Sequence, residues 1–219
     1  MADGAIPPEA ADAQGHRARP GNRRDQILDA ALQLFAQNGM ANVTTRQIAG
    51  AVGISQPSLY AHFRSADEIA TELCVRAFDA LAAQMNQTID GPQPPARRLR
   101  QMARAYIHFG IDNPDMYRVA FMLDEVKLSN GLTPGADSDL ADPAMAAGMR
   151  CFEVMQRVVF ELMDGPSACA EMTAQMIWAH VHGLTSLLIA RPDFPWADRD
   201  ALIEAHISWA PDAGVFAGP

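Results

Sequence analysis

The sequence predicts an all-α protein of about nine helices, with a small N-terminal head and a larger helical domain behind it. Three observations predict this class. Apolar residues recur at helical spacing through most of the chain after residue 22. Ser, Thr, Asp or Pro precedes several of these segments, and Gly or Pro follows several, as at helix ends. No segment shows the two-residue alternation of a half-buried strand.

In the head, the first expected helix ends at Asn38-Gly39, where a glycine can stop a helix. Its apolar face consists of Ile27, Ala31, Leu34 and Phe35. Thr44 and Gln47 fit a capping box for a short helix that ends near Val52. Gly53 follows, where a left-handed turn residue belongs.

Ser55 then caps a third short helix over residues 56–62. A second capping box, Ser65 with Glu68, opens a long helix over residues 67–90. Further helices are expected over residues 95–112, 114–122, 144–163, 167–190 and 198–209, with a Gly/Pro/Asp loop over 129–143.

Composition excludes several classes of protein. Residues 1–22 lack apolar periodicity and predict a disordered arm. No apolar run approaches the roughly 18 to 20 residues of a membrane helix, and no secretory signal is visible, so we expect a cytoplasmic protein with no membrane partner. Cys74, Cys151 and Cys169 show neither disulfide nor metal spacing. We therefore expect reduced thiols, with a redox-sensing thiol as the alternative, and no metal or cofactor.

Residues 44–63 are the most informative stretch, because two short helices flank a tight turn at Gly53. Their apolar side chains are placed to close a small core: Ile48, Ala49, Val52, Ile54, Leu59 and Phe63. This is the layout of a helix-turn-helix, whose second helix enters the DNA major groove. A plain helical hairpin with a polar face is the alternative.

The outward-facing residues suit DNA. Gln56 can pair with adenine, Ser58 can bond to several bases, and Arg46 and Tyr60 can hold phosphates. His62 points outward with them.

Residues 23–69 resemble the N-terminal domain of the TetR/AcrR family of transcriptional regulators. The likeness covers the first-helix face, Gly39, Thr45, Ile48-Ala49, Gly53 and the Leu59-Tyr60-x-His62-Phe63 run. The resemblance implies that Gln56, Pro57, Ser58, Tyr60 and His62 lie on the recognition helix, with Thr45 and Arg46 near phosphates. It also implies a DNA-binding domain over residues 23–66 and an effector-binding and dimerisation domain over 67–210. After the last expected helix, the sequence from Pro211 predicts a flexible tail over 211–219.

One position departs from the family pattern. The family usually has a phosphate-contacting Lys where this chain has Ala66. Either Arg64 substitutes for it or the grip on phosphate is weaker. The arginines at 17, 19, 23 and 24 either reach DNA or form a solvated tail.

The C-terminal half resembles the WHG-type domain of one TetR subgroup, through Trp178-x3-His182-Gly183 and the segment after Asn113-Pro114. For His182 we expect a structural hydrogen bond, beside a close helix contact that Gly183 allows. Met- and aromatic-rich helix faces indicate either plain core or a pocket for a small apolar or amphipathic effector. The candidate lining residues are Met102, Tyr106, Phe109, Tyr117, Phe121, Phe152, Met155 and Trp178.

Two stripes of mostly apolar residues predict a homodimer through a four-helix interface. The interface candidates are Ile177, Val181, Leu184, Leu188, Ile203, His206 and Ile207. The alternative is that one stripe completes the core of the single chain.

Together these features predict a homodimeric regulator of transcription that binds a near-palindromic DNA operator. The family resemblance favours a repressor released by a small effector. The alternatives are an activator of the same family, or a helical interaction protein with a weakened DNA-binding head. An enzyme is not expected, because no nucleophile–base motif or phosphate loop is present.

The net charge of −9 over 219 residues argues at first against nucleic acid. Its distribution reverses that inference: residues 17–65 carry +4, whereas residues 66–219 carry −10. The basic charge lies where the DNA-binding motif lies.

Overall fold

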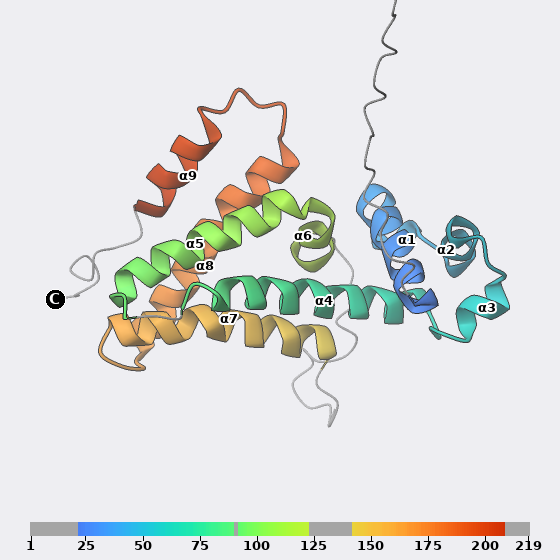
Figure 1. Cartoon of the computed structure of the whole chain (residues 1–219), viewed down its shortest axis with the longest axis horizontal. Helices are drawn as coiled ribbons and strands as arrows, with labels where there is room; N and C mark the ends of the chain where they lie inside the picture. The colour runs from blue at the N-terminus through green and yellow to red at the C-terminus, as the bar shows by residue number, and fades with distance from the viewer. Residues whose placement is uncertain (1–21, 90–91, 123–141, 209–219) are drawn as a thin grey trace, which may run out of the picture.

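The structure is a computed structural model that describes residues 22–89, 92–122 and 142–208, and every regular element in these ranges is a helix (Figure 1). The predicted all-α class is confirmed. The elements are α1 (Arg23–Asn38), the 3-10 turn η1 (Met40–Asn42), α2 (Thr45–Val52), α3 (Gln56–Tyr60), α4 (Ala66–Asn86), α5 (Pro95–Asp112), α6 (Pro114–Phe121), α7 (Pro143–Leu162), α8 (Ala168–Ala190) and α9 (Arg199–Ser208). The expected arm before Asn22, most of the 129–143 loop and the tail lie outside the described residues.

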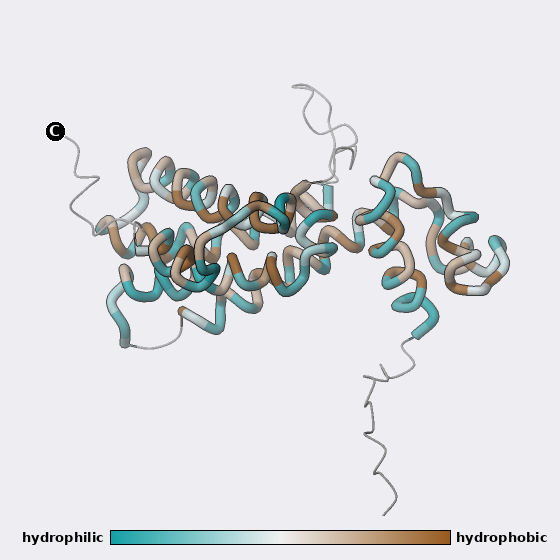
Figure 2. Tube along the Cα trace, turned by 90° about the horizontal axis from the view of Figure 1, so that it is seen from above, coloured by the Kyte–Doolittle hydropathy of each residue, from teal (hydrophilic) through white to brown (hydrophobic). Residues whose placement is uncertain are grey.

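Helices α1 to α3 form a head at one end of an elongated body (Figures 1 and 2). Helix α4 leaves the head and runs along the body, where it packs against α5, α6 and α7. Helix α8 packs on α5 and α7, and α9 packs on α5. The body also contacts the head through α6, which packs against α1. No helix in the described ranges is long and apolar enough to cross a membrane.

The turn between α2 and α3 forms as its sequence requires. Thr44 accepts a hydrogen bond from the Gln47 backbone N–H, and the Gln47 side chain accepts one from the Thr44 N–H at 2.8 Å. Gly53 adopts φ 74° and ψ 33°, a left-handed conformation that side chains disfavour. Helix α3 ends at Tyr60, two residues before the expected end, in a turn that brings Phe63 into the core.

The second expected capping box forms only in part. Ser65 caps the Glu68 N–H at 3.1 Å. The Glu68 carboxylate, however, accepts from the backbone N–H of Arg64 at 2.6 Å rather than from that of Ser65. The acidic side chain therefore ties down the residue just before the cap of α4.

Two buried clusters make up the core, one in the head and one in the body. The head cluster extends past residue 66, because it includes Leu73 and Cys74 of α4, Val119 of α6 and Ala144 of α7. Phe78 of α4 packs against both clusters. The head thus shares side-chain packing with three helices of the body.

The prediction of a close helix contact at Gly183 is wrong for contacts within the chain. A Cβ on Gly183 meets no described atom within 4 Å. The tight glycine is Gly110 of α5, where a Cβ would lie 2.3 Å from Thr185 Cγ2 and 2.9 Å from the Tyr117 ring. Gly110 therefore lets α5 pass close to α8 and α6.

Candidate functional site

The exposed face of the head brings three predicted residues together. Gln56 Nε2 donates to Thr45 Oγ1 at 3.2 Å, and Thr45 Oγ1 lies 3.2 Å from the Tyr60 hydroxyl. Tyr60 is 49% exposed although it is a large aromatic residue. Side chains from the start of α2 and from both ends of α3 thus form one polar cluster at the surface.

The remaining predicted residues belong to the same helix-turn-helix and the turn after it. Arg46, Pro57, Ser58 and Arg64 are exposed, and His62 is half-buried. These residues add cationic, hydroxyl and imidazole groups to the surface of the head. Such groups suit contacts with a phosphate backbone and with base edges.

Arg24, which the sequence places beside the basic arm, is used inside the head instead. Its guanidinium pairs with Glu72 of α4, donates to the His62 carbonyl oxygen at 2.7 Å and lies 4.0 Å from the centre of the Phe63 ring. The residue therefore joins α1 to the end of the helix-turn-helix and to α4.

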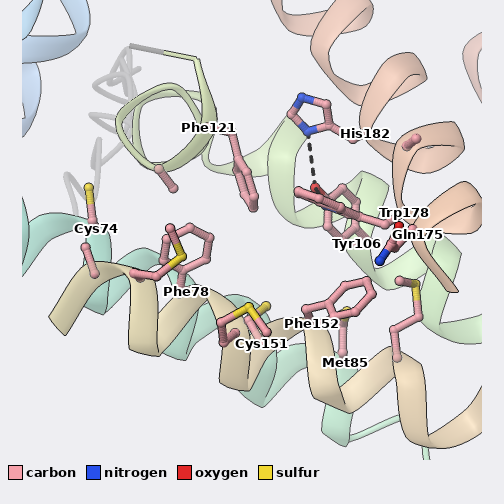
Figure 3. A pocket seen from close by; sticks show the side chains of 17 residues that line it. Cys74, Phe78, Met85, Tyr106, Phe121, Cys151, Phe152, Gln175, Trp178 and His182 are labelled. Atoms are coloured by element: carbon pink, nitrogen blue, oxygen red, sulfur yellow. Dashed lines mark hydrogen bonds between the residues drawn. The ribbon is translucent and has the colours of Figure 1, made fainter. Parts of the chain in front are cut away.

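A cavity of about 740 Å³ lies in the body, close to the head cluster (Figure 3). Five helices line it. The lining residues are Cys74, Phe78 and Met85 of α4, Tyr106 of α5, Ala120 and Phe121 of α6, Ala144, Met145, Gly148, Met149, Cys151, Phe152 and Met155 of α7, and Gln175, Trp178, Ala179 and His182 of α8. The volume is typical of a small-molecule site, about 300–1,000 Å³.

Polar groups gather on the α8 side of the cavity, with Cys74 and Phe78 on the opposite side (Figure 3). Trp178 Nε1 donates to the Tyr106 hydroxyl at 3.3 Å, and Tyr106 and Tyr117 share a hydrogen bond of 3.1 Å. The Tyr117 hydroxyl lies 2.7 Å from His182 Nδ1, and His182 Nε2 lies 3.1 Å from Ser186 Oγ. These five side chains form one continuous hydrogen-bonded network.

The described lining is uncharged at neutral pH. It contains no Asp, Glu, Lys or Arg. Burial raises the pKa of the Cys74 thiol to about 11 and that of Cys151 to about 12, with smaller contributions from nearby aspartates. Burial also lowers the pKa of His182, so its imidazole is neutral.

Five of the eight predicted pocket residues line this cavity: Tyr106, Phe121, Phe152, Met155 and Trp178. Tyr117 lies behind them in the hydrogen-bonded network, and Met102 and Phe109 are buried in the body core. Sequence reasoning missed Phe78, Met149 and Met145. The sequence could have predicted the two methionines of α7, because Met149 and Met145 precede Phe152 at helical spacing and so lie on the same face of the helix.

The predicted dimer stripe is placed differently. Ile177, Val181, Leu184, Ile203 and Ile207 are buried in the body core of the single chain, so they offer no surface to a partner; Leu188 and His206 are partly buried. These positions agree with the alternative interpretation, in which the stripe completes the core of the single chain. The exposed face of α8 carries a different stripe, namely Met172, Met176, Ala179, Gly183 and Leu187, of which Gly183 is partly buried.

His180 and His182 lie on different faces of α8: His182 joins the cavity network, and His180 packs against α9. The rings of His180 and His206 stack 3.6 Å apart, and each Nε2 donates to the other residue's carbonyl oxygen. No group of three or more metal-binding side chains occurs in the described ranges.

An exposed helix-turn-helix joined to a helical body with a cavity defines a DNA-binding regulator. Comparison with known families agrees: the family described as bacterial regulatory proteins, tetR family, matches residues 27–73, and the tetracyclin repressor-like C-terminal domain matches residues 99–209. The chain belongs to the TetR family of DNA-binding transcriptional regulators, which are not enzymes.

Among relatives, the nucleoid occlusion factor SlmA of Klebsiella pneumoniae is 31% identical over 184 residues, which cover 82% of this chain and 88% of that protein. The transcriptional activator FasR of Mycolicibacterium smegmatis is 26% identical over 210 residues, 93% of this chain and 88% of the relative.

Solved structures share the fold. The TetR family regulator PfmR of Thermus thermophilus superposes with a TM-score of 0.65 at 19% identity, covering 84% of this chain and 96% of that one. The fatty acid degradation regulator FadR of Bacillus halodurans gives 0.68 at 14% identity, covering 88% and 96%.

Proposed function

We propose that the protein is a homodimeric, sequence-specific repressor that leaves its operator when a small effector enters the cavity. The observation that carries this proposal is the pairing of an exposed Gln56–Thr45–Tyr60 cluster with a cavity whose walls reach the head core. The first feature suits DNA, and the second suits a ligand that controls it.

On DNA, Gln56 and Ser58 are the proposed base-reading residues, since an amide can bond to adenine and a hydroxyl to several bases. Thr45, Arg46, Tyr60 and the more peripheral Pro57, His62 and Arg64 are proposed to contact phosphates and sugars. In the free protein Gln56 bonds to Thr45 and Tyr60. These bonds are exchanged for bonds to DNA on binding.

For the dimer, the exposed α8 stripe replaces the interface predicted from sequence. Met172, Met176 and Leu187 are 62%, 45% and 51% exposed, unusual for large apolar side chains. Between them Ala179 and Gly183 leave room for another helix to approach. A second copy meeting this face through a two-fold axis buries both stripes and sets two recognition helices side by side.

Coupling between cavity and head has two physical routes. Helix α4 carries Phe78 at the cavity and continues to its cap at Ser65, beside the recognition helix. Helix α6 carries Phe121 at the cavity and Val119 in the head core, where the Val119 carbonyl oxygen accepts from the Cys74 thiol at 3.5 Å. A ligand that displaces Phe78 or Phe121 therefore shifts the head.

Because coupling between two sites is reciprocal, operator DNA must weaken effector binding by the same factor by which the effector weakens DNA binding. The WHG-type subgroup remains part of the proposal. Trp178 and His182, the first two residues of that motif, both line the cavity.

Substitution of one proposed base-reading residue and one proposed phosphate contact tests the DNA-binding role. Gln56→Ala and Tyr60→Ala should each cost about 1–3 kcal/mol in operator affinity, measured by titration on a site selected from random DNA. Both variants should stay folded dimers by circular dichroism and sedimentation. Unchanged affinity in both would remove α3 from the recognition role.

Activation is the second candidate, favoured by the likeness to the activator FasR. A reporter gene placed behind the selected operator separates the two: deletion of the regulator raises expression for a repressor and lowers it for an activator. An interaction protein with a weakened head would show neither a sequence preference nor a steep dependence of DNA affinity on salt.

A further inference from the structure

The polar network beside the cavity has an unusual property, because it can run in either direction with a neutral histidine. In one direction Tyr106 donates to Tyr117, Tyr117 donates to His182 Nδ1, and His182 Nε2 donates to Ser186. In the reverse direction Ser186 donates to Nε2, Nδ1 donates to Tyr117, and Tyr117 donates to Tyr106. The hydroxyl hydrogen of Tyr106 is then left for the cavity.

Trp178 adds a second donor at the same place. Its indole N–H, which can only donate, bonds to the Tyr106 oxygen at 3.3 Å. This distance is longer than the usual N–H···O distance of about 2.9–3.0 Å. In the reversed network Tyr106 instead accepts from Tyr117, so its oxygen keeps one hydrogen-bond donor even when the indole N–H turns to another acceptor. Two donors, Tyr106 O–H and Trp178 N–H, then serve one acceptor in the cavity.

The rest of the described lining restricts the charge of a ligand. A buried carboxylate or ammonium needs a charged partner, and the described lining offers none. Opposite the polar side, Phe78 and Cys74 present ring and sulfur surfaces that suit an apolar body (Figure 3). Gln175, the one amide in the described lining, is exposed to solvent.

We propose that the cavity takes an uncharged, largely apolar compound with one carbonyl-type oxygen, which accepts hydrogen bonds from Tyr106 and Trp178. The carbonyl oxygen has two lone pairs and so satisfies both donors. Exposed lining residues on α7 and α8, among them Met145 and Met149, mark the side from which it enters. This inference rests on the proposed function, in that it names the chemical class of the effector.

A series of four compounds with one phenyl group and similar length tests the class by titration calorimetry on the full chain. Benzylacetone carries a ketone, hydrocinnamate a carboxylate, phenylpropylamine an ammonium group, and butylbenzene no polar group. Benzylacetone should bind at least about tenfold more tightly than either charged analogue.

Tyr106→Phe should weaken benzylacetone binding about threefold to tenfold and leave butylbenzene within about twofold. Trp178→Phe should also weaken benzylacetone, which keeps the test decisive if the first variant folds poorly. Trp196→Phe, at a tryptophan outside the described cavity lining, is the matched control and should leave benzylacetone binding within about twofold. Equal binding of a charged analogue, no binding of any compound, or an unaffected ketone in both cavity variants would overturn the proposal.

The same titrations repeated with operator DNA separate this inference from the proposed function. Benzylacetone that binds as expected but leaves operator affinity unchanged would support the ligand class and contradict effector control. A charged compound that releases the operator and binds in the cavity would support effector control and overturn the ligand class.

Discussion

Gly110 shows how one residue position sets the distance between three helices. Its missing side chain lets Thr185 of α8 and the ring of Tyr117 of α6 pack against α5. A methyl group there overlaps Thr185 Cγ2, which belongs to a short β-branched side chain that is fully buried and bonded to the Val181 carbonyl oxygen at 2.7 Å. Neither neighbour can move without disturbing the network at His182.

Gly110→Ala should therefore lower the free energy of unfolding by about 1–3 kcal/mol, as overpacked core substitutions do. Gly50→Ala is the matched control, because an added Cβ at that exposed helical position meets no described atom within 4 Å. The control should be neutral or slightly stabilising. Urea unfolding of both variants measures the difference, and equal stability would contradict the close approach.

Residues also show the limits of sequence reasoning. The left-handed Gly53 and the Thr44 cap were predictable, because both depend on neighbours a few residues away. The tight contact was expected at Gly183 and occurs at Gly110, because the space around a helical glycine depends on which helix packs there. Nothing in the local sequence distinguishes the two.

At the scale of elements, the head is joined to α4 through Arg24 of α1. Loss of its guanidinium removes the ion pair with Glu72, the bond to the His62 carbonyl oxygen and the contact with the Phe63 ring. Arg24→Ala should therefore cost about 1–3 kcal/mol of stability. Arg23→Ala, which removes only an exposed bond to Gln26, should cost less than half as much.

Thermal unfolding of the Arg24→Ala and Arg23→Ala variants measures the two losses of stability. A double-mutant cycle that combines Arg24→Ala with Glu72→Gln isolates the contribution of the Arg24–Glu72 ion pair. If Arg24 instead served DNA, its removal would lower operator affinity and leave stability unchanged.

The stacked pair His180–His206 joins α8 to α9, and burial of His206 in this contact makes stability depend on pH. Burial lowers the pKa of His206 below its ordinary value of 6.5, and the hydrogen bond to the His180 carbonyl oxygen only partly opposes this shift. His206 is therefore protonated less readily in the folded chain than in the unfolded chain. Its contribution to the free energy of unfolding is fully present above the ordinary pKa of 6.5 and is lost as the pH falls below that value.

His206→Gln should flatten this pH dependence in thermal unfolding measured above and below pH 6.5. His182→Gln is a second test, since burial lowers the pKa of His182 in the same direction. His62→Gln, at a half-buried position on the head, is the control. A wild-type-like slope in both test variants would show that other groups cause the dependence.

The order of the helices was predictable because apolar periodicity marks most of them, and a capping residue or, for α5 and α6, a proline marks where each begins. The sequence Asp164-Gly165-Pro166 likewise marks the break between α7 and α8. The face that α8 turns inward was not predictable. Both of its faces are apolar, so periodicity alone does not separate Val181, which is buried, from Leu187, which is exposed.

For the whole molecule, charge is divided between the two parts: +4 over residues 17–65 and −10 over residues 66–219. Such polarity directs the head toward DNA and keeps the body away from it. At the boundary, Ala66 stands at the first position of α4 and is followed by Asp67 and Glu68. The arginine nearest to this helix start in the sequence is Arg64. Its backbone N–H is fixed by Glu68, whereas its side chain is exposed.

If Arg64 contacts a phosphate in place of the usual Lys, Arg64→Ala should reduce the slope of log affinity against log salt by about one. The affinity should fall to a similar extent on operator and on unrelated DNA, because a phosphate contact carries no sequence information. Ala66→Lys should do the reverse and steepen the slope by about one. Arg97→Ala, an exposed arginine on α5, serves as the control for net charge. An unchanged slope for Arg64→Ala together with a steeper one for Ala66→Lys would mean that the natural chain forgoes this phosphate contact, and that the base-reading residues of α3 carry more of its affinity.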